Sequence, residues 1–157
     1  MRNLVFFFSI FFFVSCNTTK EEVKENILFI VSNQHTYGDT KINSANHFAE
    51  IVLAYDVLVK EGYQVDFVSP KGGAIPLGYL NTSDSIQKHY LYDASFMNKL
   101  KTTKKPADVA PSNYKAVYYV GGGAAMYGVP EDKGIQKISI SIYNNNGVVS
   151  AVRVLLI

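Results

Sequence analysis

Short apolar runs alternate with segments of helical periodicity along most of the chain, and this alternation constrains the fold more than any single motif. The first run, residues 27–31, is short and entirely apolar, as in a strand buried on both faces. Apolar residues at helical spacing follow over 44–61, and Gly62 stands where a helix C′ residue is expected. Parallel neighbouring strands need crossover connections, so the pattern predicts an α/β fold with a parallel sheet and helices on both faces.

The same alternation continues to the end of the sequence. It predicts a strand at 65–68, a short helix at 92–100, a strand at 116–120, a helix at 135–143 and a last apolar stretch at 148–157. The segment 73–92 is predicted to be irregular, and loops of that length tend to carry function. Ligands of such sheets bind at the carboxyl ends of the strands, which directs attention to 32–35, 69–73, 121–123 and the residues after Val152.

Charge and composition exclude several kinds of site. The formal net charge is +2, and no basic cluster is denser than Lys101, Lys104 and Lys105, so nucleic acid is not an expected partner. The three histidines are scattered, and surface histidines are the simpler interpretation, although His47 lies three residues before Glu50 on one predicted helix face. The glycines at 121–123 do not complete a dinucleotide fingerprint, and neither a metal nor a cofactor is predicted.

The first residues differ from the rest, because six of the ten phenylalanines lie in the first thirteen positions. Arg2 precedes an apolar run at 4–14, which is shorter than the roughly 20 residues that span a bilayer and suits a signal-peptide core. The arrangement resembles a bacterial lipoprotein signal, with residues 1–15 as the signal, Cys16 as the lipidation site and 16–26 as a polar tether. It predicts an exported lipoprotein anchored in the membrane of a bacterial envelope. A plain secretory signal or an uncleaved anchor with an unmodified Cys16 remains the alternative.

Three motifs in order resemble a known family. They are Phe-Ala-Glu at 48–50, Gly-Tyr-Gln-Val-Asp-Phe-Val-Ser-Pro-Lys-Gly-Gly at 62–73, and Tyr-Tyr-Val-Gly-Gly-Gly-Ala-Ala-Met-Tyr-Gly-Val-Pro at 118–130. Together they resemble the ThiJ/PfpI superfamily, which is also described as class I glutamine-amidotransferase-like, and within it the chaperone and glyoxalase III branch. The resemblance implies a flavodoxin-like domain over 27–157.

The resemblance also implies a site. In this family a cysteine on a sharp strand-to-helix turn attacks the substrate, and a glutamate of the first helix hydrogen-bonds to it. Carried over, Glu50 is the family acid/base, and Gly122 and Gly123 form the oxyanion loop. The alternatives are an exposed helix carboxylate and a simple turn. The implied activity is that of a glutathione-independent glyoxalase, a deglycase or an amidase-like hydrolase on a small aldehyde or acyl substrate, and a homodimer is compatible with it.

The sequence departs from the family at the nucleophile. Residues 147–152 lead into the turn as the family does, but Arg153 stands where the cysteine is expected, and residues 154–157 would prolong the strand. The interpretation is a C-terminally incomplete domain, truncated or frameshifted and catalytically inactive. The competing hypothesis is a non-catalytic binding or chaperone-like module that keeps the pocket around Glu50.

Overall fold

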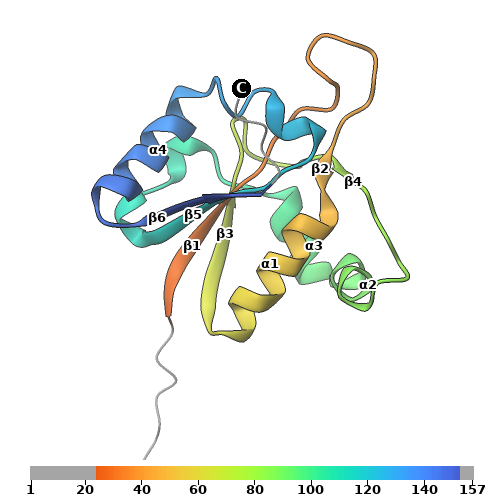
Figure 1. Ribbon diagram of the computed structural model, residues 1–157, viewed down its shortest axis with the longest axis horizontal. Helices are drawn as coiled ribbons and strands as arrows, with labels where there is room; N and C mark the ends of the chain where they lie inside the picture. The colour runs from red at the N-terminus through yellow and green to blue at the C-terminus, as the bar shows by residue number, and fades with distance from the viewer. Residues whose placement is uncertain (1–23, 153–157) are drawn as a thin grey trace, which may run out of the picture.

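A four-stranded parallel sheet forms the centre of the computed structural model, which describes residues 24–152 (Figure 1). The strands lie in the order β3-β1-β5-β6. Their bounds are β1 Lys24–Ile30, β3 Tyr63–Val68, β5 Tyr114–Tyr119 and β6 Val148–Ala151. Each neighbouring pair is parallel, so the predicted fold class is confirmed.

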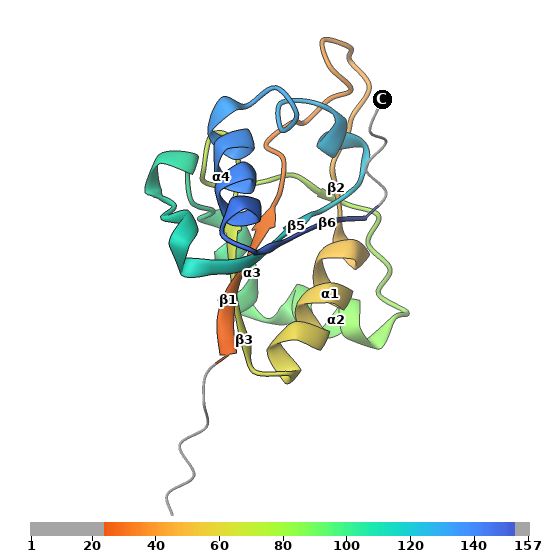
Figure 2. The same cartoon turned by 60° about the vertical axis from the view of Figure 1, so that its left-hand side comes forward.

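Helices cover both faces of this sheet, as Figures 1 and 2 show. One face carries α1 (Phe48–Lys60), α2 (Ser85–Tyr92) and α3 (Ala94–Lys101), and the other carries α4 (Lys133–Asn144) with the short 3-10 helices η1 (Pro106–Asp108) and η2 (Pro111–Asn113). Side chains alternate along β1, so Phe29 enters an aromatic core under α1 to α3, whereas Leu28 enters an aliphatic core under α4. Because both faces of β1 are covered, its run is apolar throughout.

Helix α1 begins at Phe48, four residues later than predicted, because the residues just before it form a short strand. Residues Asn46–His47 form β2, which pairs with β4 (Leu77–Gly78). The buried Asn46 side chain accepts a hydrogen bond from the Ser32 backbone N–H at 2.8 Å and donates to the carbonyls of Ser32 at 2.8 Å and Pro76 at 2.9 Å. At its other end α1 stops as predicted, with Gly62 in the left-handed region at φ +85°.

The prediction of an irregular segment at 73–92 is wrong in part, since α2 occupies its second half. Asp84 caps this helix by accepting a hydrogen bond from the Gln87 N–H at 2.8 Å. Asp93 then separates α2 from α3, so the helix expected at 92–100 begins at Ala94. Helix α2 packs on α1, where Tyr90 donates to Asp56 at 3.1 Å. The sequence signal for α2 is the cap, because its apolar periodicity is weak.

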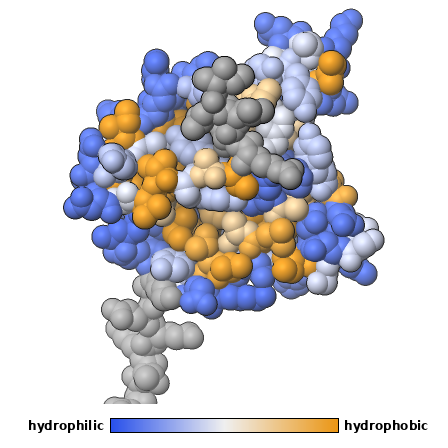
Figure 3. Space-filling view, in the orientation of Figure 1, coloured by the Kyte–Doolittle hydropathy of each residue, from blue (hydrophilic) through white to orange (hydrophobic). Residues whose placement is uncertain are grey.

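Within residues 24–152, strand β6 is an edge of the sheet and pairs with β5. All four of its residues are exposed, and Figure 3 shows hydrophobic side chains gathered on the face that carries α1 and β6. Val152 continues the pairing by donating its N–H to the Tyr119 carbonyl at 3.1 Å. Arg153 and the rest of the predicted last stretch lie outside the described residues.

Candidate functional site

A pocket of about 300 Å³ opens where β5 runs into its glycine loop. It is lined by Tyr37, His47, Glu50, Tyr79, Gly122, Gly123 and Met126. These residues come from four separate parts of the chain: the loop after β1, the start of α1, the segment after β4 and the loop after β5. The pocket therefore lies at the carboxyl end of a parallel strand, where ligands of such sheets bind.

Glu50 reaches this pocket from the first turn of α1. Its side chain is partly buried and its Oε2 atom is buried, which differs from a carboxylate exposed on a helix surface. Tyr118 donates a hydrogen bond to the Glu50 backbone carbonyl at 3.2 Å. Burial first, and then the Glu50 charge, raise the pKa of Tyr118 to about 12. The Tyr118 side chain therefore links β5 to the first turn of α1, which carries Glu50.

The glycine loop is fixed against the segment that precedes α1. Gly122 has φ +108°, and a Cβ there would lie 2.6 Å from the Ala45 carbonyl oxygen and 2.7 Å from the His47 nitrogen. Only glycine fits this approach. The His47 N–H donates to the Gly121 carbonyl at 3.1 Å. The predicted site residues Glu50, Gly122 and Gly123 are thus brought together, because the loop and the start of α1 are hydrogen-bonded to each other.

Two further pocket residues escape sequence reasoning. The rings of His47 and Tyr79 stack with their centroids 4.7 Å apart and their planes at 6°. His47 is therefore a pocket residue and not a surface histidine as interpreted, and its buried Nδ1 has no hydrogen-bond partner among the described residues. Tyr79 has φ +58°, a backbone strain of about 1–3 kcal/mol that tends to occur at functional sites. The spacing of His47 and Glu50 hinted at His47, whereas no pattern indicates Tyr79.

The other strand ends at which the sequence suggested a ligand site do not line this pocket. In the segment 69–73, Ser69 and Thr103 share a hydrogen bond of 2.7 Å, and Lys71 donates its N–H to Asn33 at 2.8 Å, so this turn is tied to its neighbours by structural contacts. Within residues 24–152 no group of three histidine, cysteine or acidic side chains is placed to hold a metal ion. Cys16 and Arg153 lie outside the described residues.

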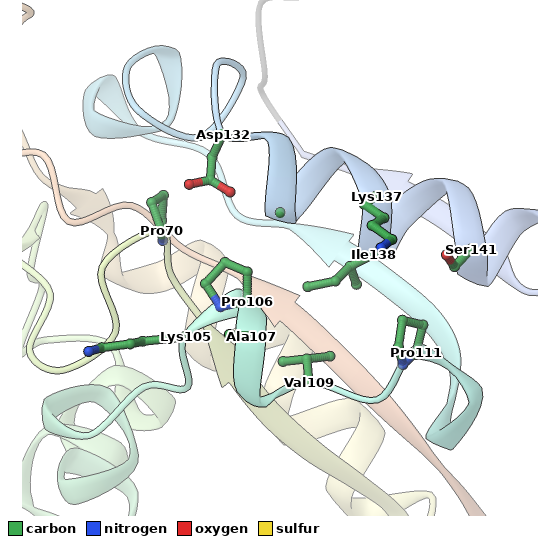
Figure 4. Close-up of a pocket in the computed structure, with 11 residues that line it drawn as sticks. Pro70, Lys105, Pro106, Ala107, Val109, Pro111, Asp132, Lys137, Ile138 and Ser141 are labelled. Carbon is green, nitrogen blue, oxygen red and sulfur yellow. The ribbon is translucent and has the colours of Figure 1, made fainter.

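A second and larger cavity, of about 680 Å³, lies between η1 and α4 (Figure 4). Val109 and Ile138 contribute apolar surface to it. The Lys105 side chain points away from both Lys137 and Asp132 (Figure 4). Its polar groups therefore do not converge on one point, unlike those around Glu50.

Comparison with known proteins gives consistent results. No family model matches the chain. The chain is 31% identical over 140 residues to a glutathione-independent glyoxalase of Schizosaccharomyces pombe, covering 82% of this chain and 56% of that protein. It is 28% identical over 130 residues to glyoxalase 3 of Candida albicans, covering 76% and 52%. The chain thus spans about half the length of the curated relatives that it matches.

Solved structures give the same picture for the fold. The Rapid Encystment Protein of Francisella tularensis superposes with a TM-score of 0.75 at 25% identity, over 82% of this chain and 58% of the other. Glyoxalase III of Candida albicans gives 0.69 at 24% identity, over 81% and 56%. A ThiJ/PfpI domain protein of Brachyspira murdochii gives 0.50 at 16% identity, over 80% and 57%. The last two likenesses concern the fold alone.

The comparisons overturn one prediction. The prediction of an exported lipoprotein anchored in the membrane of a bacterial envelope is wrong, because these curated relatives are glyoxalases of yeasts. Within residues 24–152 no helix combines the length and the apolar character needed to cross a membrane. The segment 1–15 and Cys16, on which that prediction rested, lie outside the described residues.

Proposed function

The chain belongs to the ThiJ/PfpI superfamily, and from this membership we propose that its pocket binds small aldehydes of the kind on which glutathione-independent glyoxalases act. The observation that carries the proposal is the meeting of Glu50, Gly122 and Gly123 in one cavity. A volume of about 300 Å³ lies at the lower end of the range for small-molecule sites and has room for methylglyoxal.

In this proposal the loop and the carboxylate have separate tasks. The backbone N–H groups of the loop at Gly122 and Gly123 face the carbonyl oxygen of the ligand, where negative charge would develop during attack. If a nucleophile were present, Glu50 would accept or return a proton at the neighbouring carbon. The buried position of Oε2 supports this role, because a carboxylate shielded from water acts more strongly on a bound ligand.

Turnover of an aldehyde by the chemistry that the family resemblance implies would also need a thiolate. The sequence contains one cysteine, Cys16, and the position at which the resemblance expects the nucleophile is Arg153. We therefore propose that this chain binds its ligand without converting it.

The second candidate is a binding or chaperone-like module that acts on unfolded protein. The observation that favours it is the apolar surface of β6, where Val148 is 61% and Val149 44% exposed. Exposed apolar patches of this kind occur at protein interaction sites.

One experiment separates these proposals. The purified 157-residue chain is titrated with hydroxyacetone, an unreactive ligand of similar shape, while backbone amide chemical shifts are recorded, and lactate is assayed after incubation with methylglyoxal. We expect shifts at the glycine loop, no lactate, and affinity for hydroxyacetone reduced about tenfold in Glu50→Gln. The matched control is Glu131→Gln, which changes an exposed carboxylate outside the pocket.

Other outcomes would overturn particular parts of the proposal. Lactate production that disappears in Glu50→Gln would show that the chain is an enzyme. Absence of any hydroxyacetone binding would refute the small-ligand pocket. If the chain then suppressed the aggregation of an unfolded client protein, the second candidate would replace the first.

A further inference from the structure

The hydroxyl groups of two tyrosines that line the pocket meet each other, and the proposed roles of Glu50 and the glycine loop do not use them. The hydroxyl oxygens of Tyr37 and Tyr79 lie 3.4 Å apart. Both residues line the pocket, although they are 42 positions apart in the sequence. A Cβ at Gly123 would overlap the Tyr37 hydroxyl, so this hydroxyl occupies the space beside the loop.

The Tyr79 ring is held in place before any ligand arrives. Its backbone has φ +58°, which a bulky residue adopts only when its surroundings impose it. The surroundings are the β2–β4 pairing, which ends at Gly78, and the stacked ring of His47. The cost of the strained backbone is thus offset by contacts that direct the hydroxyl toward Tyr37.

The Tyr37 ring is held independently. Its backbone closes a turn, because its carbonyl accepts hydrogen bonds from the Thr40 hydroxyl at 2.7 Å and the Thr40 N–H at 3.1 Å. Its N–H donates to the Ile42 carbonyl at 3.0 Å, and its ring meets Tyr127 edge-on with 6.4 Å between centroids. Two rings fixed from different sides therefore place their hydroxyls together at little further entropic cost.

The chemistry of the pair is that of a hydrogen-bond donor. A phenol both donates and accepts, so when one hydroxyl donates to the other, the second keeps a free proton to offer. The hydrogen bond with Tyr37 first, and then burial, raise the pKa of Tyr79. The hydroxyl pair can therefore donate a hydrogen bond to a carbonyl or hydroxyl oxygen of a ligand.

We propose that Tyr37 and Tyr79 are the specificity-determining residues of the pocket, and that their hydroxyls bind the second oxygen of a ligand whose first oxygen faces the loop at Gly122 and Gly123. This inference rests on the proposed function. Under it the pocket distinguishes ligands with two neighbouring oxygen atoms from those with one. The selectivity comes from two side chains that the backbone geometry has already ordered.

The test compares two ligands of nearly equal size in the full chain. Hydroxyacetone carries two neighbouring oxygens, and acetone carries one. We expect wild type to bind hydroxyacetone about two- to tenfold more tightly than acetone, and Tyr37→Phe and Tyr79→Phe each to bring this ratio close to one. Tyr92→Phe is the control, because Tyr92 is 74% exposed and lies outside the pocket. Thermal melting of each variant shows whether it is folded.

The outcomes distinguish this inference from the proposed function. Binding of hydroxyacetone with an unchanged ratio in folded Tyr37→Phe and Tyr79→Phe would overturn the inference and leave the pocket intact. Loss of all binding in wild type would overturn the proposed function and the inference with it. A ratio that falls equally in Tyr92→Phe would also count against the inference, because the effect would then not come from the hydroxyl pair.

Discussion

Strands β1 and β6 are both apolar and parallel, yet they lie in opposite environments. Between Ile27 and Val31 no residue of the first run is more than 7% exposed. In β6, Val148 is 61% and Val149 is 44% exposed. β1 is paired on both sides, with β3 and β5, whereas the only strand paired with β6 within residues 24–152 is β5.

The difference shows that burial depends on neighbours more than on the apolar run itself. A β-branched run is compatible with either place in a sheet, and only the number of partner strands and covering helices decides how much water it excludes. An open apolar edge is also a site where another chain can pair. The comparison therefore predicts that truncating an apolar side chain to alanine costs far more stability in β1 than in β6.

The largest effect is expected in β1. Phe29 is fully buried and contacts Tyr118 and Phe67 with ring centroids 4.6 Å and 5.4 Å apart. We expect Phe29→Ala to lower the free energy of unfolding by about 3–5 kcal/mol, through lost burial and the cavity that remains. Urea unfolding followed by circular dichroism measures this loss.

The corresponding truncation in β6 is Val149→Ala, which removes a smaller side chain. Because almost half of the Val149 side chain already contacts water, we expect a loss below about 1 kcal/mol. A loss as large as that of Phe29→Ala would contradict the comparison. It would show that β6 is covered in solution by another copy or another chain.

The sequence predicts those helices and strands in which apolar residues recur with a regular spacing. The parallel sheet, the helices on both faces and the end of α1 at Gly62 follow from such patterns. Glu50, Gly122 and Gly123 are predicted by resemblance, and the structure places them in one pocket. Their catalytic roles remain proposals.

The sequence does not predict contacts made by single residues between distant segments. Asn46 and His47 form β2, although the sequence predicts them as part of the first helix. Nothing in the local sequence shows that the Asn46 side chain hydrogen-bonds to the backbone of Ser32 and Pro76. Tyr79 has a backbone conformation that is rare for its residue type. α2 is missed because its apolar periodicity is weak, which leaves the cap at Asp84 as its main sequence signal.

An effect between those of Phe29→Ala and Val149→Ala is expected just after β1, at Ser32. Asn46→Ala would leave the buried Ser32 N–H and carbonyl without their partner, which costs about 2 kcal/mol in the free energy of unfolding. Since His47 follows directly, we also expect chemical shift changes at the glycine loop. The control is Asn33→Ala, because Asn33 also bridges two segments but is partly exposed, so water can replace its hydrogen bonds. Equal losses in the two variants would show that β1 is held by its neighbouring strands alone.

The last prediction concerns the pH dependence of stability at β3, which forms the other edge of the sheet. Within the described residues this edge, unlike β6, is covered by a further segment, which contains Lys104. Lys104 donates its N–H to the Phe67 carbonyl at 2.9 Å, and its ammonium contacts Asp66 at 2.7 Å. Burial raises the pKa of Asp66, but the hydrogen bonds from Lys104 and Tyr114 outweigh it and hold the pKa below its usual range. The folded state therefore favours the ionised carboxylate.

The sign of the pH effect follows from this depressed pKa. The contribution of Asp66 to stability is fully present above the pKa of the unfolded chain and is lost as the pH falls through the lower pKa of the folded state. Between about pH 5 and pH 2 we expect wild type to lose more stability than Asp66→Asn, as measured by urea unfolding at each pH. Glu25→Gln serves as the control, because the Glu25–Lys115 pair is 3.2 Å long with both side chains more than half exposed, and its removal should leave the pH profile unchanged. Parallel profiles for wild type and Asp66→Asn would show that the Lys104 segment protects β3 through backbone pairing alone, without help from the charge.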